Sequence, residues 1–305
     1  MIRTLGLIDA FRVAAVSTPD IAAYSTYAVA GHQPALQGFA FVVAGLRSKR
    51  TSVALVALEE GKLLGMASAR RASGPTAWFV DHLALPTNKD APIGELLEAA
   101  SAYAGRRGAE RLFLKLPDTW DIQKLASQSG FFPSYQALLL TLPGRSPLYK
   151  EESLLNTRLR RPADDHALFR LHNACTPVEV RYKTGLTLQQ WKDAEEPATQ
   201  RTRELVMERE GDVAAWLRLD YHRGWTKVRT FTLPNAAVDM PSLVAYVVKA
   251  GKRRGILWEV PEYQANLRLL LERMGFEVSG CYRLMVNPLA EMVKKPAWAP
   301  APTSV

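Results

Sequence analysis

The stretch TNKDAPIGELLEAA, residues 87–100, joins a polar loop to the start of an apolar helix. The first turn of a helix has unpaired N–H groups and the positive end of the helix dipole, so this junction could hold an anion such as a phosphate. Lys89 adds a cation there, whereas Pro92 lacks an N–H and Asp90 adds a negative charge. The same residues also fit a helix cap, in which the Asp90 carboxylate accepts hydrogen bonds from the first turn. The sequence leaves both interpretations open.

The histidines and cysteines form no recognisable reactive group. Five histidines show no metal-ligand spacing, at positions 32, 82, 166, 172 and 222. Cys175 and Cys281 are far apart in the chain, which predicts a reducing compartment rather than a disulfide framework. The N-terminal segment lacks the uninterrupted apolar core of a signal peptide, and the run FAFVVAGL is too short to cross a bilayer. We therefore expect a cytoplasmic protein without a membrane segment.

The composition is basic, with 39 Lys and Arg against 30 Asp and Glu and a net charge of +9. Such a charge can attract nucleic acid or acidic partners. The Lys and Arg residues form no long run, however, and they do not interleave with aromatic residues as in single-strand nucleic-acid grooves. We expect a scattered basic surface and do not expect nucleic acid as a partner.

The two halves of the chain repeat the same landmarks at a nearly constant offset of about half the chain. The matching pairs are Leu85-Pro86 with Leu233-Pro234, Gly108 with Gly255, and Gly130-Phe131 with Gly275-Phe276. This offset predicts two similar domains, because two copies are too few for a solenoid. We place an N-terminal copy at residues 1–145, a C-terminal copy at 155–291 and a disordered tail, rich in Pro and Ala, at 292–305.

Each copy predicts the same order of elements: opening helices, an antiparallel meander of three strands, and a helix–strand–helix–strand crossover. In the N-terminal copy, strands are expected at 51–59, 62–71, 77–85, 111–117 and 135–143, and helices at 8–16, 20–47, 91–108 and 121–130. In the C-terminal copy, strands are expected at 203–210, 212–222, 227–234, 256–261 and 282–289, and helices at 164–174, 187–195, 241–255 and 264–275.

This order resembles the GNAT (Gcn5-related N-acetyltransferase) fold, present twice in tandem. The fold class is α+β (α/β), with a mixed, mostly antiparallel sheet flanked by helices in each copy. The helix–Gly–Phe junctions carry the resemblance, as in LLERMGF at 270–276, together with strands that end in Leu-x-Leu-Pro or Thr-Leu-Pro. The resemblance covers almost the whole chain and rests on element order more than on sharp motifs.

The resemblance implies that acetyl-CoA is a co-substrate and lies in a V where the two middle strands of a copy splay apart. In the N-terminal copy the pantetheine would bind the strand backbone at Leu83, Ala84 and Leu85. The pyrophosphate would bind the following loop and helix start, where Lys89, Ile93 and Gly94 occupy the matching positions. The corresponding segment of the C-terminal copy, NAAVDMPSLVAY, has no glycine and no cation. We therefore assign acyl-CoA binding to the N-terminal copy.

In the family, an amine attacks the thioester, a carboxylate or a water accepts its proton, and a Tyr often protonates the leaving thiolate. The Tyr position aligns with Ala126 and Leu271, which carry no phenol. For the base, the N-terminal copy offers Asp81 or His82. Adjacent residues of a strand face opposite sides, so we expect at most one of them in the cleft and choose Asp81.

Several other polar residues are expected to have no part in the chemistry. Asp220, His222 and Arg229 are interpreted as surface residues of the C-terminal copy, and the carboxylates of EVPEYQ at 259–264 as part of a solvated loop. Tyr135 and Tyr282 are expected to pack or to contact solvent.

These assignments predict an acyl-CoA-dependent N-acetyltransferase that acts on an amine of a small molecule or peptide. The substrate pocket would be lined by residues near 20–47 and 176–200. The alternative is a catalytically degenerate GNAT-like binding or interaction protein, which the missing Tyr and the presence of Pro92 favour. The sequence indicates neither the acyl acceptor nor the oligomeric state.

Overall fold

The structure is a computed structural model that describes residues 1–6, 9, 21–23, 50–60, 62–86, 92–118, 120–142, 157–222, 224–233, 238–251 and 255–289. The linker at 143–156 and the tail at 292–305 lie outside these residues, and so do Lys89 and Asp90. The predicted disorder of the tail and the exact domain boundaries therefore stay predictions.

The two halves contain the same series of elements, as the repeated landmarks predict. The N-terminal series is β3 (Ser52–Glu59), β4 (Lys62–Arg71), β5 (Ala77–Pro86), α4 (Ile93–Gly105), β6 (Arg111–Pro117), α5 (Trp120–Gln128) and β7 (Phe132–Leu142). The C-terminal series is β9 (Thr202–Arg209), β10 (Asp212–Tyr221), β11 (Trp225–Thr232), α9 (Met240–Ala250), β12 (Gly255–Pro261), α10 (Ala265–Arg273) and β13 (Glu277–Pro288). Gly130 and Gly275 both have positive φ, of 86° and 82°, which explains glycine after α5 and α10.

The openings of the two copies differ from the prediction in part. The C-terminal copy begins with β8 (Thr157–Leu159), the 3₁₀ helix η1 (Pro162–Asp164), α6 (Asp165–Cys175), α7 (Val178–Thr184) and α8 (Leu188–Ala194). In the N-terminal copy, β1 (Ile2–Thr4) and β2 (Ile21–Ala23) are strands. The expectation of helix from residue 20 is therefore wrong for β2, because its backbone pairs with a free edge of β5. Most of the two helices expected at 8–16 and 20–47 lies outside the described residues.

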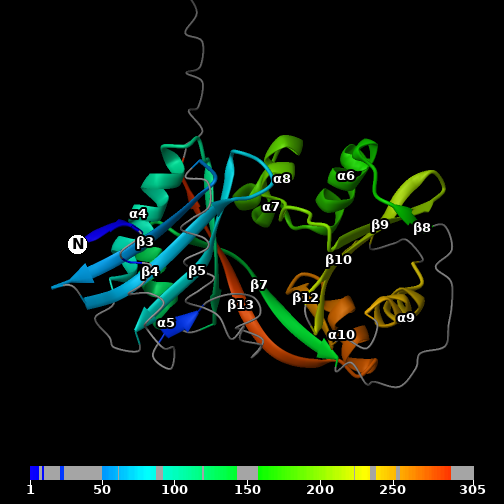
Figure 1. Ribbon diagram of the computed structural model, residues 1–305. Helices are drawn as coiled ribbons and strands as arrows, with labels where there is room; N and C mark the ends of the chain where they lie inside the picture. Colours follow the sequence, from blue (N-terminus) through cyan, green and yellow to red (C-terminus); the bar gives the residue numbers. More distant parts are fainter. Residues whose placement is uncertain are drawn as a thin grey trace, which may run out of the picture.

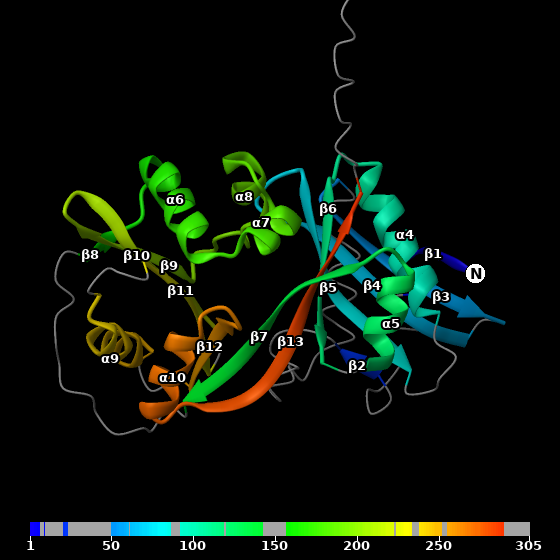
Figure 2. The same cartoon turned by 180° about the vertical axis from the view of Figure 1, so that it is seen from behind.

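One sheet runs through both copies, in the order β1-β3-β4-β5-β6-β13-β7-β12-β11-β10-β9-β8 (Figure 1). The last strand of each copy is exchanged: β13 pairs with β6 of the N-terminal copy, and β7 pairs with β12 of the C-terminal copy. These two long strands also pair with each other and cross at the centre of the molecule (Figure 2). Each copy therefore needs a strand from the other to complete its part of the sheet.

Each half has its own apolar core beside this shared centre. On β3, Val53, Leu55 and Ala57 face the core under α4, while Ala54 and Val56 face the opposite side, as the alternation of a strand requires. A second core lies under α9 and α10 and includes the fully buried Trp258. Helix α4 packs on β3 and β4, and α6 packs on β10 and β11.

Helix α8 of the C-terminal copy docks on the β4–β5 turn of the N-terminal copy. The Asp193 carboxylate accepts hydrogen bonds from Thr76 N at 3.2 Å and from Thr76 Oγ1 at 2.6 Å. A Cβ on Gly74 would lie 1.8 Å from Asp193 Oδ1, so only glycine fits at this approach. This contact ties α8 of the C-terminal copy to the N-terminal copy at the junction between them.

Candidate functional site

The middle strands of each copy part at equivalent positions. In the N-terminal copy, β5 and β6 pair in parallel only from Ala77 to Val80 and from Arg111 to Leu114. In the C-terminal copy, β11 and β12 pair in parallel only from Trp225 to Val228 and from Gly255 to Trp258. All four strands continue beyond these points. The V-shaped splay that the family resemblance implies is therefore present twice.

A β-bulge lies at the parting point of the N-terminal copy. The register of β4 and β5 shifts from Ser68↔His82 to Ala69↔Val80, which leaves Asp81 as the extra residue. The bulge places Asp81 and His82 in the wall of the same cleft. The expectation that at most one of them faces the cleft is wrong, because the strict alternation on which it depends is broken at this residue.

Asp81 and His82 form a compact polar group with two residues of β4. Asp81 Oδ1 accepts a hydrogen bond from Ser68 Oγ at 2.5 Å and lies 3.4 Å from His82 Nδ1. Asp81 Oδ2 lies 3.3 Å from Arg70 Nε. Burial raises the pKa of Asp81, but the hydrogen bonds from His82 and Ser68 and the charges of His82 and Arg70 outweigh it, so the net shift is downward. Asp81 is therefore held as a carboxylate beside the imidazole.

These residues line a cleft of about 810 Å³ between the two copies, which we call the outer cleft. Its N-terminal wall is formed by β4, β5 and β6. Its C-terminal wall is formed by β10, β11 and the loop at 196–201. The lining side chains that carry charge are Arg70, Asp81, Lys115, Glu196, Arg201, Arg218, Asp220 and Lys227, with His82 and His222 beside them.

A buried network of ion pairs forms the floor where the two copies meet. Lys115 of β6 and Lys227 of β11 both contact Glu259 of β12, with closest distances of 3.4 and 3.0 Å. Both lysines also lie 3.2 Å from Glu196. The Tyr282 hydroxyl donates a hydrogen bond to Glu259. The side chain of Glu259 is only 3% exposed, so the interpretation of its segment as a solvated loop is wrong at this residue.

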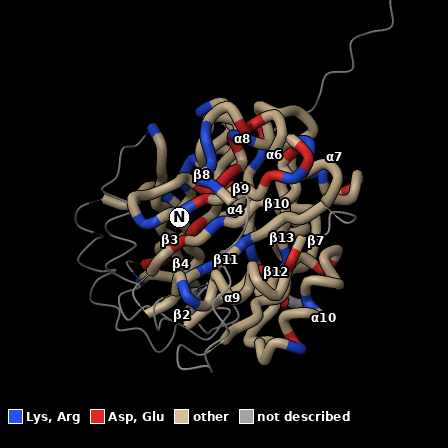
Figure 3. The backbone as a smooth tube through the Cα atoms, turned by 90° about the vertical axis from the view of Figure 1, so that its right-hand side faces the viewer, with Lys and Arg blue, Asp and Glu red and all other residues tan. Residues whose placement is uncertain are grey.

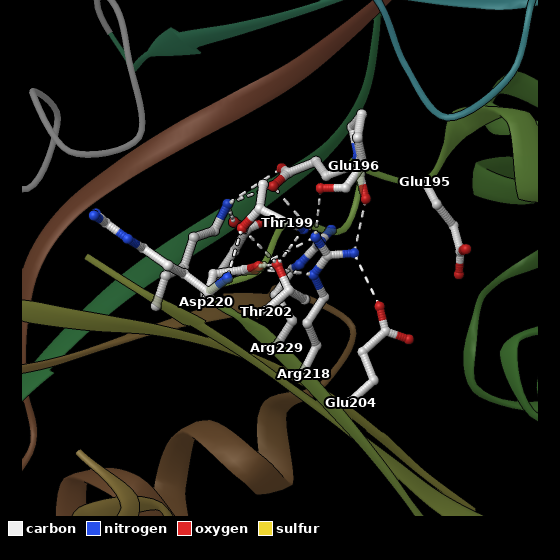
Figure 4. A network of polar contacts seen from close by, with 12 residues as sticks. Glu195, Glu196, Thr199, Thr202, Glu204, Arg218, Asp220 and Arg229 are labelled. Atoms are coloured by element: carbon white, nitrogen blue, oxygen red, sulfur yellow. Dashed lines mark hydrogen bonds and ion pairs between the residues drawn. The ribbon is translucent and has the colours of Figure 1, made fainter. Parts of the chain in front are cut away.

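The same network fixes the loop at 196–201 against β10 (Figure 4). Arg218 Nε donates to Asp220 Oδ2 at 2.9 Å, and its two terminal nitrogens donate to the carbonyls of Glu196 and Pro197. Arg229 NH2 lies 3.6 Å from Glu196. The expectation of a surface position is therefore wrong for Asp220, which is 9% exposed, and for Arg229, which belongs to this network. His222 is exposed.

The pKa shifts follow from this close arrangement of charges. Burial by itself raises the pKa of Glu259. The positive charges of Lys115, Lys227 and Arg229 outweigh burial and lower this pKa to about 2. Burial lowers the pKa of Lys115 below its ordinary value, whereas the closer ion pairs of Lys227 raise its pKa despite burial. Burial and the Glu259 charge raise the pKa of Tyr282, which keeps the phenol protonated. The prediction that Tyr282 packs or contacts solvent missed this hydrogen bond to Glu259.

The residues predicted to bind the pantetheine lie at the far end of β5. Leu83 is fully buried in the core under α4. Ala84 pairs with Met66 of β4 on one side and with Ala23 of β2 on the other. Strand β2 therefore lies along the edge that β6 has left, and it pairs with Ala84, Leu85 and Pro86. This is the backbone edge that the resemblance assigns to the pantetheine.

The N-termini of the equivalent helices α4 and α9 differ. Helix α9 is capped by Asp239, whose carboxylate accepts hydrogen bonds from Ser242 N at 3.2 Å and from the Ser242 hydroxyl. Helix α4 begins at Ile93 after Pro92, which provides no side-chain cap. Gly94 lies in its first turn, with Ser129 Oγ 3.2 Å from where a Cβ would be. The cap interpretation is confirmed for α9; for α4 it concerns Asp90, which lies outside the described residues, so there it stays a prediction beside the anion interpretation.

The positions aligned with the thiolate-protonating Tyr are apolar. Ala126 and Leu271 are fully buried in the two cores. Their helices, α5 and α10, therefore have no phenol at these positions. The phenols of Tyr135, Tyr263 and Tyr282 instead lie near Glu259, and Tyr135 and Tyr263 stack edge to face at 5.7 Å. The equivalent positions of Tyr135 and Tyr282 in the repeat were the only sequence signal for this group.

Other classes of site were also considered for the described residues. No group of three or more His, Cys, Asp or Glu side chains within them is placed to hold a metal ion. None of the helices in the described ranges has both the length and the hydrophobicity needed to cross a membrane. Along the part of the backbone that the structure describes, positions of Lys and Arg alternate with positions of Asp and Glu (Figure 3).

Solved structures with the same fold include N-acetyltransferases. A GCN5-related N-acetyltransferase from Sphaerobacter thermophilus is 15% identical, with a TM-score of 0.59, and the match covers 95% of this chain and 96% of that one. A tandem GNAT protein from the clavulanic acid biosynthesis pathway is 12% identical, with a TM-score of 0.51 and coverage of 89% and 99%. Saccharomyces cerevisiae N-myristoyltransferase with bound myristoyl-CoA is 9% identical, with a TM-score of 0.52 and coverage of 94% and 78%.

No family model and no curated protein matches the sequence. The structural likeness nevertheless extends over nearly the full length of this chain and of the first two proteins. The chain therefore has the GNAT fold, as its element order and internal repeat predict.

Proposed function

We propose that this chain is an acyl-CoA-dependent N-acyltransferase whose N-terminal copy holds the acyl-CoA and whose outer cleft holds the amine. The observation that supports this best is the parting of β5 and β6 at Asp81 and His82, with both side chains in a cleft large enough for a substrate. By analogy with acyltransferases that share this fold, an acyl-CoA is the proposed co-substrate.

The chain's residues fit an acyl-CoA in the N-terminal copy better than in the C-terminal copy. Among the described residues no side chain caps the first turn of α4, whereas Asp239 caps the first turn of α9. In the C-terminal splay, Gln264 donates to the Thr230 carbonyl and Cys175 Sγ donates to the Thr232 carbonyl. Two backbone carbonyls of this splay are therefore already used, just as β2 uses the β5 edge at residues 84–86 in the N-terminal copy, so the preference for the N-terminal copy rests on its helix start. Lys89 remains the proposed cation for the pyrophosphate.

In this proposal His82 accepts the proton of the attacking amine and Asp81 positions the imidazole. A bound acyl-CoA supplies an activated thioester: the amine nitrogen forms a bond to the carbonyl carbon, and the carbon–sulfur bond breaks. His82 Nδ1 lies 3.1 Å from Ser68 Oγ and 3.4 Å from Asp81 Oδ1, so a proton on this nitrogen faces both groups and leaves the other ring nitrogen to accept the amine proton. The thiolate takes its proton from solvent, because Ala126 replaces the phenol of the family. The sequence-based choice of Asp81 as the base is thereby revised to a positioning role.

Calorimetry with acetyl-CoA tests the proposal. We expect binding by the full-length protein, and we expect Lys89→Glu to weaken it by about tenfold or more, since a charge-assisted contact contributes roughly 1.5–3 kcal/mol. Lys62→Glu makes the same charge change at the exposed start of β4 and serves as the matched control. Absence of binding at millimolar acetyl-CoA, or equal binding by the Lys89 variant, contradicts the assignment.

The degenerate binding protein remains a second candidate because β2 lies on the β5 edge assigned to the pantetheine. Ala22→Pro removes a backbone donor from β2 and should weaken its pairing. If β2 only competes with acyl-CoA, this variant binds acetyl-CoA more tightly than the wild type. If neither protein binds, the degenerate function is favoured.

A further inference from the structure

A second cavity lies beyond the outer cleft, between α6, α7 and α8 and the strands of both copies. We call it the inner chamber, and its volume is about 140 Å³. Residues of 176–200 line it, including Val180, Thr184, Trp191 and Ala194, as the sequence predicted for a substrate pocket. Strands β10, β11 and β12 of the C-terminal copy supply further wall residues. The chamber thus lies where the middle strands of the C-terminal copy part.

Aromatic rings form one third of the wall of the inner chamber. Seven of its 21 lining residues are Phe, Tyr or Trp, which favours a flat apolar ligand over a polar one. The rings are fixed by one another: Phe79 and Phe113 stack at 4.9 Å, and Trp216 and Phe231 at 5.4 Å. A bound ring would therefore enter a preformed slot and would order few side chains.

The charges around the chamber leave no free ion to bind a charged ligand. Three cations and three anions line it: Lys115, Arg218, Arg229, Glu195, Glu196 and Glu259. Each has an opposite-charge partner, and Glu195 pairs with Arg160 at 3.1 Å. Burial lowers the pKa of His172 in this wall to about 4, so its imidazole is neutral near pH 7. A ligand group in this chamber should be neutral, because a charged one would lose its hydration without gaining a counter-ion.

One donor in the wall is unused by the described residues. Arg229 Nε is buried and has no hydrogen-bond partner among them, although the guanidinium pairs with Glu196. Because this nitrogen has almost no accessible surface, a ligand in the chamber does not contact it, and the choice of a ring as ligand rests on the aromatic part of the wall.

The inner chamber adjoins the outer cleft. Phe79, Lys115, Glu196 and Arg218 line both cavities. A molecule with its ring in the chamber would therefore extend past these residues toward Asp81 and His82. The chamber itself has room for a single ring, since an apolar cavity of about 150 Å³ binds benzene.

We propose that the inner chamber binds one neutral aromatic ring of the acyl acceptor, so that the substrate is an arylalkyl amine with its nitrogen in the outer cleft. This identification of the substrate class rests on the proposed function. The binding of a ring in the chamber is independent of the proposed function, because it depends only on the residues of the chamber wall.

Fluorine NMR with 4-fluorobenzyl alcohol tests the chamber without acyl-CoA. The probe has one ring and one neutral oxygen and cannot be acylated on nitrogen. We expect saturable line broadening with the full-length protein and at least a tenfold weaker affinity for Ala194→Phe, which fills the chamber from α8. Ala198→Phe is the matched control, because Ala198 is exposed and lines a different surface hollow. Saturable binding that Ala194→Phe leaves unchanged places the ring elsewhere and overturns the proposal.

A second substitution that fills the chamber keeps the test valid if Ala194→Phe does not fold. Thr184→Phe projects from α7 on another wall, and its fold is checked by the near-UV circular dichroism of the wall tryptophans. Loss of probe binding in both folded variants supports the proposal, and absence of binding in the wild type overturns it.

A separate activity assay tests whether the acyl acceptor is an arylalkyl amine. With acetyl-CoA present, 2-phenylethylamine should be acetylated and butylamine should react at least tenfold more slowly in kcat/KM. If the ring probe binds but neither amine reacts, the proposed function fails while the chamber stands. If butylamine reacts equally well, the substrate class is wrong.

Discussion

At the two points where parallel strands part, the two strands carry residues of opposite charge, and the signs are exchanged between the copies. In the N-terminal copy the first residues beyond the pairing are Asp81 on β5 and Lys115 on β6. In the C-terminal copy they are Arg229 on β11 and Glu259 on β12. Lys115 and Glu259 occupy equivalent places and contact each other across the junction. The exchange of signs lets the two copies neutralise each other where they meet.

The surroundings then give the two splays different uses. The bulge at Asp81 opens the N-terminal splay to the outer cleft, while the C-terminal splay has no register shift on β10 and β11. Its backbone carbonyls are occupied by Gln264 and Cys175, and its helix is capped by Asp239. The same strand framework therefore borders the polar outer cleft at the N-terminal splay and the inner chamber with its aromatic residues at the C-terminal splay.

The largest effect on activity is expected for His82, which is present in the N-terminal splay and has no equivalent imidazole in the C-terminal splay. His82→Gln should lower kcat by about 10²- to 10⁴-fold, the usual contribution of a general base, with the affinity for acetyl-CoA unchanged. Thr230 occupies the equivalent position on β11, and Thr230→Val should leave kcat unchanged. Steady-state kinetics at saturating acetyl-CoA measures both, and equal effects of the two substitutions would remove the catalytic difference between the copies.

The charge pair at the junction should dominate stability. Glu259→Ala leaves Lys115 and Lys227 buried without one of their two carboxylates, so we expect a loss of about 3–5 kcal/mol in the free energy of unfolding. Asp212→Ala breaks an ion pair with Arg170 in which both side chains are about 70% exposed, and it should cost less than about 1 kcal/mol. Urea unfolding measures the difference, and similar losses would show that the junction pair is no more than a surface contact.

The same carboxylate predicts a pH dependence. Because folding lowers the pKa of Glu259 from 4.5 to about 2, its stabilisation is complete above pH 4.5 and is lost as the pH falls toward 2. Glu259→Gln cannot titrate there, so its stability should fall less over that interval than that of the wild type. Parallel slopes for the two proteins would show that other carboxylates control acid unfolding.

The smallest effect is expected from exchanging the helix starts. Asp239→Ala should lower stability by about 1 kcal/mol, since it removes the cap of α9. Pro92→Asp introduces a cap on α4, so it should stabilise the fold slightly and weaken acetyl-CoA binding by competing for the same N–H groups. Thermal unfolding and calorimetry follow the two changes. Unchanged acetyl-CoA affinity in Pro92→Asp would show that the start of α4 is not the anion site.

The sequence by itself determined the elements and the repeat. Strand periodicity located β3, β4, β5 and β6 almost to the residue, because apolar alternation is a local property of the chain. The comparison between copies predicted an Asp cap at both helix starts, and the cap is confirmed at Asp239 for α9, while Asp90 lies outside the described residues. Helix α7 was missed because its sequence VEVRYKT contains β-branched and aromatic residues of low helix propensity, whereas α8, of the same length, has a Thr187 cap.

Only the tertiary structure decided how the copies join and what the site contains. The exchange of β7 and β13 and the burial of Glu259 depend on contacts between residues far apart in the chain, which local patterns do not encode. The bulge that brings Asp81 and His82 together depends on the register with β4, and one inserted residue reverses the alternation on which the sequence argument relied. The positions of most helices and strands thus follow from the sequence, whereas the difference between the N-terminal and C-terminal splays follows from how these elements pack.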